Sequence, residues 1–225
     1  ESDFTDRVGL ILDREFVRHC IAGADAIVHT ATLHQPPVAS HIRQDFIDFH
    51  ITGTLNLLEE AARAGLRRFV FTSTTSAFGA ALVPPQGAPA AWITEDVQSE
   101  PKNIYGATKT SAEGLCQLFH RNQGLPCVVL RTSRFFPEED DGDEIRQNFA
   151  DENAKANEFL FRRVDLGDAV SAHICALERA PELGYGRYII SATSPFEKYD
   201  LAGLRSDTPE IIRQSFAKFV ALYRH

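Results

Sequence analysis

The stretch Asn103-Ile104-Tyr105-Gly106-Ala107-Thr108-Lys109 places a phenol and an ammonium group four residues apart. In a helix this spacing puts Tyr105 and Lys109 on one face, one turn apart. A phenol has an unperturbed pKa of about 10, and a nearby positive charge lowers that pKa towards the working pH. The pair is therefore a candidate acid/base unit. The same spacing also occurs on solvated helix faces, so both interpretations stay open on spacing alone.

Three mainly apolar segments surround this helix in the sequence. Arg68–Thr72 leads into a hydroxyl-rich turn, Asp25–Ala31 precedes it, and Cys127–Leu130 follows the Tyr-Lys helix. Apolar strands without alternation are typical of a parallel sheet that is covered on both faces. Strands separated by helical segments therefore predict an α/β fold, a doubly wound parallel sheet in which these three strands are adjacent.

The Tyr-Lys pair, the strand that ends in Ser73-Thr74-Thr75-Ser76 and the earlier strand resemble the extended short-chain dehydrogenase/reductase family, also called the NAD-dependent epimerase/dehydratase family. The resemblance runs from about Asp13 to Ala192. It implies a Rossmann-like dinucleotide-binding domain in residues 1–135 and 164–180, and a small, partial substrate-binding lobe in residues 136–163 and 181–225. It also implies NAD or NADP as cofactor, a small-molecule substrate, a homodimer and a cytoplasmic location.

The N-terminal part of the sequence departs from the family pattern. Members begin with a strand, a glycine-rich phosphate-binding turn and a helix. This sequence has no G-x-x-G-x-x-G motif and opens on polar residues, so the resemblance predicts that the first βαβ unit is missing from it. The sequence does not distinguish NAD from NADP, because the residue that reads the ribose 2′ position belongs to that unit. Val8–Leu12 is a candidate short strand, Asp13–Gly23 a helix and Ser40–Ala64 one long helix.

The resemblance assigns three catalytic residues. The family's catalytic Ser or Thr lies five residues before the Gly that closes its turn, and counting back from Gly79 gives Thr74, with Ser73 as the neighbour most easily confused with it. Tyr105 would exchange a proton with a substrate hydroxyl while hydride passes between the substrate carbon and the nicotinamide. Lys109 would hold the nicotinamide ribose and lower the pKa of Tyr105. Thr74 would hydrogen-bond the substrate oxygen.

Further residues are expected to contact the cofactor, because ligands bind at the C-terminal ends of the strands in this fold. His50 stands where the family usually has Asn, and functional and structural roles for it are weighed equally. The expected cofactor-binding residues are Thr30, Ala31, Thr32, His50, Thr72, Tyr105, Lys109 and Ser133.

Arg134 is a candidate substrate-binding residue, together with Thr74. It follows the strand Cys127–Leu130, at a position where nucleotide-sugar members commonly have Asn. A guanidinium group suits a carboxylate or a phosphate, which favours an anionic substrate other than a nucleotide sugar. The alternative is an ion pair with the acidic run Glu138–Glu144, which we interpret as a solvated loop because its spacing does not fit a calcium loop.

Composition limits the function classes. The formal net charge of -8 argues against a nucleic-acid partner, and no apolar run is long enough to span a bilayer. The 4 cysteines lack a C-x-x-C motif and the 8 histidines lack ligand spacing, so no metal site is expected. Two hypotheses remain. The first is an NAD(P)-dependent oxidoreductase or epimerase, and a sugar 4,6-dehydratase is disfavoured because Thr74 is followed by Thr75-Ser76 rather than Asp-Glu. The second is a non-catalytic fragment or interaction module that has lost dinucleotide binding.

Overall fold

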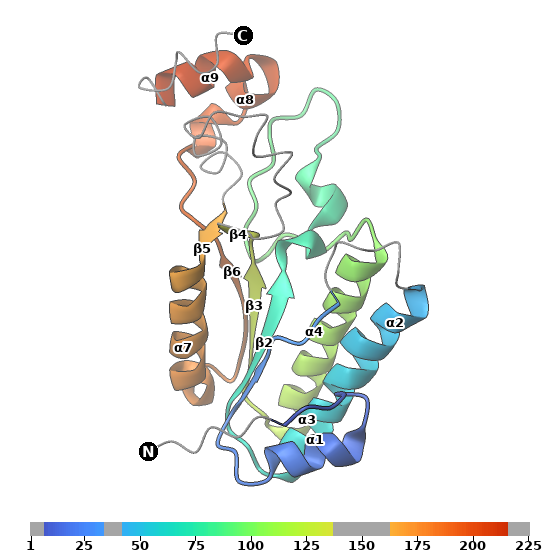
Figure 1. Ribbon diagram of the computed structural model, residues 1–225. Coiled ribbons are helices and arrows are strands. Elements are labelled where there is room, and N and C mark those ends of the chain that lie inside the picture. The colour runs from blue at the N-terminus through green and yellow to red at the C-terminus, as the bar shows by residue number, and fades with distance from the viewer. Residues whose placement is uncertain (1–6, 34–41, 137–162, 216–225) are drawn as a thin grey trace.

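Four parallel strands form the central sheet of the protein (Figure 1). The computed structural model describes residues 7–33, 42–136 and 163–215. The strand order is β1-β2-β3-β6. The strands are β1 (Ile27–His29), β2 (Phe69–Thr74), β3 (Cys127–Thr132) and β6 (Tyr185–Ile190). The three strands predicted from the sequence are thus adjacent and parallel, and this prediction is confirmed.

Helices cover both faces of the sheet, as Figure 1 shows. One face carries α1 (Arg14–Ile21), α3 (Gly53–Arg63) and α4 (Ile104–Gln123), and the other carries α7 (Leu166–Leu183). Side chains alternate between faces along a strand. Phe69 and Phe71 accordingly join the core beneath α3 and α4, whereas Val70 packs with Ala176 and Ala180 of α7. The fold is Rossmann-like, with the apolar strands buried between two helical layers.

Two of the expected elements differ in the structure. Val8–Leu12 does not form a strand, because the chain turns there. The amide of Asp13 donates to the carbonyl of Leu10 over 3.0 Å, and the Asp13 side chain caps α1. The expected long helix contains a π-helical turn at Asp48–Thr52, between α2 (Arg43–Ile47) and α3.

The segment between β2 and α4 brings these two elements together. Gly79 has φ +47, and a Cβ there would lie 2.0 Å from the carbonyl oxygen of Glu100. The long loop that starts at this glycine ends at Asn103, whose side chain accepts from the Gly106 amide over 2.9 Å and begins α4. A Cβ on Gly106 would lie 2.8 Å from the carbonyl oxygen of Ser76, so a glycine lets the first turn of α4 pack against the end of β2.

Several short elements lie beyond the C-terminal ends of the sheet strands (Figure 1). They are the parallel pair β4 (Phe135–Phe136) and β5 (Val164–Asp165), and the helices α8 (Gly203–Ser206) and α9 (Thr208–Ser215). The division into two domains stays a prediction, and the acidic run Glu138–Glu144 lies outside the described residues. Among the helices that the structure describes, none is long and apolar enough to cross a membrane.

Candidate active site

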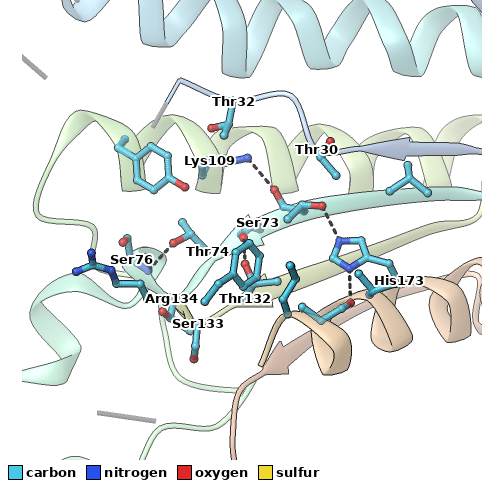
Figure 2. A pocket seen from close by; sticks show the side chains of 18 of the residues that line it. Thr30, Thr32, Ser73, Thr74, Ser76, Lys109, Thr132, Ser133, Arg134 and His173 are labelled. Carbon is cyan, nitrogen blue, oxygen red and sulfur yellow. Dashed lines mark hydrogen bonds between the residues drawn. The ribbon is translucent and has the colours of Figure 1, made fainter. Parts of the chain in front are cut away.

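A cavity of about 720 Å³ opens at the C-terminal ends of β1, β2 and β3, where this sheet topology predicts a ligand site. Hydroxyl groups line one part of it and the apolar face of α7 lines another. Figure 2 shows this pocket. Its lining residues are Val28, Thr30, Thr32, Thr72, Ser73, Thr74, Thr75, Ser76, Tyr105, Lys109, Thr132, Ser133, Arg134, Phe135, Leu166, Ala169, Val170, His173, Ile174 and Leu177.

Tyr105 lies in the first turn of α4. Its side chain lines the same pocket as the hydroxyls of Thr74, at the end of β2, and Thr32, just after β1. Burial raises the pKa of the Tyr105 phenol above its ordinary value, and the nearby hydroxyls of Thr74 and Thr32 act in the opposite direction. The phenol is therefore the resting form of Tyr105 at neutral pH.

Ser73 and Thr74 have different surroundings, although they are neighbours in sequence. The Ser73 hydroxyl donates to a carboxylate oxygen of Glu113 over 2.5 Å, in the interior. Thr74 accepts from the amide of Ser76 over 3.1 Å and lines the pocket together with Tyr105. The alternation of side chains along the strand accounts for the difference. The geometry therefore favours Thr74 over Ser73 as the partner of Tyr105.

Lys109 lies one turn after Tyr105 and is 1% exposed. Its ammonium group donates to the carbonyl oxygen of Thr72 over 2.7 Å. Carbonyls at alternate positions of β2 point towards β1, and the carbonyl of Arg68 accepts from Ile27 there. Because β1 ends at His29, the Thr72 carbonyl has no further β1 residue to pair with, and Lys109 takes that place.

Burial lowers the pKa of Lys109 to about 8, and the nearby carboxylate of Glu113 opposes this change. The sequence led us to expect that Lys109 would lower the pKa of Tyr105. In the structure, burial is the largest influence on Tyr105, and the Lys109 ammonium is directed to a backbone carbonyl instead.

A buried ion pair beneath the pocket was missed in the sequence. Arg131 of β3 and Glu113 of α4 are 0% and 2% exposed, and two guanidinium nitrogens of Arg131 donate to the carboxylate over 2.6 and 3.0 Å. Arg131 also donates to the hydroxyl of Ser99 over 2.8 Å, which attaches the long loop to the sheet. The feature of the sequence that could have indicated this pair is the charged residue Arg131, directly after the apolar run Cys127–Leu130.

His50 lies behind the pocket wall rather than in the lining. Its side chain is 1% exposed and contacts Thr32, Leu33 and Thr108. Burial lowers the pKa of His50 to about 3, and the charge of Lys109 acts in the same direction. Of the other expected cofactor residues, Thr30, Thr32, Thr72 and Ser133 line the pocket, and Ala31 is outside the lining set. Arg134 is exposed and lines the pocket.

His173 of α7 is a pocket residue that sequence reasoning did not single out. Its Nδ1 lies 2.7 Å from the carbonyl oxygen of Ala169, which can only accept, so Nδ1 carries the proton. Nε2 lies 2.7 Å from the hydroxyl oxygen of Thr72, with which it forms a hydrogen bond, as Figure 2 shows. Helical spacing could have indicated His173, because the residues of α7 that line the pocket recur at three- and four-residue steps. Thr72 is thus held by His173 through its side chain and by Lys109 through its carbonyl.

Comparison with known families identifies one that matches most of the chain. The model of the NAD dependent epimerase/dehydratase family matches residues 7–190.

The chain belongs to the NAD-dependent epimerase/dehydratase family.

Some of the relatives carry the names of sugar-nucleotide enzymes. A dTDP-glucose 4,6-dehydratase of Streptomyces niveus is 35% identical over 130 residues, which are 57% of this chain and 37% of that protein. A UDP-glucose 4-epimerase of Streptomyces lividans is 32% identical over 125 residues, 54% of this chain and 36% of that protein. The chain thus matches little more than a third of the length of these relatives.

Solved structures show the same fold. A short-chain dehydrogenase/reductase superfamily protein of Agrobacterium tumefaciens with bound NAD has a TM-score of 0.67 and 25% identity, over 94% of this chain and 71% of that chain. The UDP-glucuronic acid 4-epimerase of Bacillus cereus in complex with NAD has a TM-score of 0.66 and 22% identity, over 86% and 61%.

Proposed function

We propose that this family member is an NAD(P)-dependent oxidoreductase or epimerase that moves hydride between nicotinamide and a secondary alcohol or ketone. One observation carries the proposal. Thr74, Tyr105 and Lys109 line one cavity, and Lys109 lies one helical turn after Tyr105. An acid/base group, a hydroxyl donor and a cation in one pocket are the parts that this reaction needs.

The pocket residues fit a nicotinamide nucleotide. Lys109 and the hydroxyls of Thr30 and Thr32 are donors suited to ribose hydroxyl groups, and Val170 and Ile174 of α7 provide an apolar wall for a ring. The nicotinamide supplies the hydride chemistry when it is bound. The protein supplies position, proton transfer and the electrostatic field.

The resting protonation states suit proton donation by Tyr105. Because burial raises its pKa, the side chain holds its proton at neutral pH and can deliver it to a substrate oxygen that gains negative charge. Thr74 can donate a second hydrogen bond to the same oxygen and fix it in line with Tyr105. With a pKa of about 8, Lys109 is mostly protonated at pH 7 and favours negative charge nearby.

The names of the relatives support a sugar derivative as the substrate class. Two features of the sequence and the pocket modify this expectation. Arg134 brings a permanent positive charge to the rim, which suits a carboxylate or phosphate on the substrate. Thr75 and Ser76 follow Thr74 where the elimination step of a 4,6-dehydratase would need acidic groups, which favours an epimerase or a simple dehydrogenase.

Assays with the protein expressed from its complete gene test the proposal. Candidate sugars and sugar acids are incubated with NAD or NADP, and the absorbance of reduced nicotinamide is followed together with the stereochemistry of the sugar. A dehydrogenase accumulates free reduced cofactor, whereas an epimerase changes the sugar without net reduction. Absence of both reactions, with no cofactor binding by calorimetry, would favour the non-catalytic alternative. The homodimer stays a prediction that analytical ultracentrifugation can test.

A further inference from the structure

Thr72, Thr74 and Thr132 line the pocket from the face of the sheet that α7 covers. Val70 of β2 and Leu130 of β3 pack against α7 on this face. Because side chains alternate along a strand, Thr72 and Thr74 lie on the same face as Val70. In the same way, Thr132 lies on the face of Leu130. The hydroxyl groups of Thr72 and Thr132 therefore border one part of the pocket, next to α7.

The proton of the Thr132 hydroxyl is directed into the protein. Thr132 Oγ1 donates to the carbonyl oxygen of Ser73 over 3.0 Å, as Figure 2 shows, and a carbonyl can only accept. A hydroxyl group has one proton and two acceptor lone pairs. Thr132 therefore has only lone pairs left to offer to a ligand.

His173 gives the Thr72 hydroxyl the same direction. The imidazole donates from Nδ1 to the carbonyl oxygen of Ala169, one turn earlier in α7, over 2.7 Å. In the neutral ring Nε2 then has no proton. Nε2 lies 2.7 Å from the Thr72 hydroxyl oxygen, so in this form only Thr72 can donate. With its proton committed to His173, Thr72 also offers lone pairs to the pocket.

The backbone of Thr72 is fixed independently of its hydroxyl. Its carbonyl accepts from the Lys109 ammonium over 2.7 Å, and β2 is paired with β1 on one side and with β3 on the other. The direction of the hydroxyl is what these contacts leave open. His173 therefore acts on the hydrogen-bonding character of Thr72 rather than on the position of its backbone.

We propose that His173 is a positioning residue that keeps Thr72 an acceptor, and that Thr72 and Thr132 form an acceptor pair for the carboxamide NH2 of nicotinamide. The inference rests on the proposed function and adds the part of the pocket that recognises the cofactor ring. Val170 and Ile174, which flank His173 on α7, form the apolar wall proposed for that ring. The carboxamide nitrogen carries the N–H donors of the ring, and two oxygens without an available proton suit a donor.

Calorimetry with two dinucleotides tests the acceptor pair in the protein expressed from its complete gene. The 3-acetylpyridine analogue of NAD has a methyl group in place of the amide nitrogen, so it keeps the carbonyl and loses the donor. We expect the wild type to bind NAD roughly three- to tenfold more tightly than the analogue, as for a lost hydrogen bond. Thr72→Val should lower this ratio by weakening the binding of NAD and not of the analogue. Thr72→Ser keeps the hydroxyl and should retain the ratio.

Two substitutions of His173 test its role through Thr72. Leucine fits the apolar wall but leaves the Thr72 proton free to turn into the pocket, whereas glutamine can place its side-chain oxygen near the position of Nε2. We expect His173→Leu to lower the ratio of the two affinities and His173→Gln to retain most of it. In the Thr72→Val background, His173→Leu should cause no further loss, because both changes remove one interaction. A full additional loss would show that His173 contacts the ligand itself and would overturn its positioning role.

Nitrogen NMR on histidine-labelled protein tests the direction of the hydrogen bond without any ligand. The resonances that are absent from His173→Gln identify His173. At neutral pH we expect a protonated Nδ1 and an unprotonated Nε2, and the Nε2 resonance should shift more in Thr72→Val than in Thr72→Ser. A protonated Nε2, or an Nε2 resonance that ignores Thr72→Val, would overturn the role of His173.

Failure of this inference and failure of the proposed function give different results. If the protein binds neither dinucleotide, the proposed function fails, and the acceptor pair fails with it. If it binds both and the ratio of affinities ignores Thr72→Val, only the acceptor pair fails. A wild type that binds the analogue as tightly as NAD would overturn the acceptor pair without any variant. Melting temperatures measured on all variants report folding separately.

Discussion

The ammonium group of Lys109 donates a hydrogen bond of 2.7 Å to the carbonyl oxygen of Thr72, at the point where strand β1 has ended. The contact joins helix α4 to the end of β2 and fixes the cation one turn from Tyr105. It also buries a charge, since Lys109 is 1% exposed. The free-energy cost of that burial is reported by the pKa of Lys109, which falls to about 8.

Protein stability should therefore depend on pH through Lys109. In the unfolded chain a lysine has a pKa of about 10.4, so between about pH 8 and 10.4 the unfolded state binds more protons than the folded state. The free energy of unfolding should rise with pH across this window because of Lys109, by up to about 3 kcal/mol. Lys109→Met lacks this contribution. Chemical denaturation of both proteins at several pH values measures the difference, and parallel pH curves would contradict the buried, charged lysine.

Substitution of Ser73 should mainly lower stability, and substitution of Thr74 should mainly lower turnover. Ser73→Ala removes a hydrogen bond to the buried carboxylate of Glu113 and should cost about 1–3 kcal/mol of unfolding free energy, with turnover largely kept. Thr74→Val removes a hydroxyl at the proposed site of charge development and should lower kcat roughly a hundredfold, with a smaller effect on stability. Each variant is the control for the other. The opposite pattern would show that Ser73 is the catalytic hydroxyl.

The Glu113–Arg131 pair should contribute strongly to stability. Glu113→Ala leaves the guanidinium of Arg131 buried without its carboxylate, and breaking such a pair typically costs about 3–5 kcal/mol. Glu59→Ala is a matched control, because its ion pair with Arg14 is partly exposed to solvent and is expected to contribute little to stability. Denaturant titrations compare the two variants. Equal losses would mean that the buried network is not coupled to the fold.

Much of the fold could be predicted from local patterns. The apolar runs in the sequence identified three adjacent strands of the sheet, because burial on both faces leaves a clear pattern. The strand expected at Val8–Leu12 was wrong, because apolar residues at this spacing can equally lead into a capped helix. The π-helical turn at Asp48–Thr52 left no pattern, since one inserted residue barely changes a helical repeat.

Less of the candidate site than of the fold could be predicted from the sequence. Thr74, Tyr105 and Lys109 were found from motif spacing, and all three line one pocket. His173 was not found, because its role depends on α7 packing across the sheet from Thr72. The position of His50 behind the wall depends equally on tertiary packing. Spacing along a chain does not report which side chains meet from different elements.

Arg134 tests the substrate class. If it contacts an anionic group of the substrate, Arg134→Ala should raise KM for a sugar acid or sugar phosphate by roughly tenfold or more, as expected for a lost charge-assisted hydrogen bond, and should change KM for a neutral sugar little. Arg134→Lys keeps the charge but loses the forked geometry, and should fall between the two. Tight binding of a nucleotide sugar that ignores Arg134→Ala would remove Arg134 from the proposed substrate site.

The most direct test of the central claim is the turnover of Tyr105→Phe, measured beside cofactor binding by calorimetry. The substitution removes one oxygen atom and keeps the ring that packs against His50. If Tyr105 is the acid/base group, cofactor affinity should stay near that of the wild type and kcat should fall by roughly a hundredfold or more. Wild-type turnover in Tyr105→Phe would contradict the proposed function.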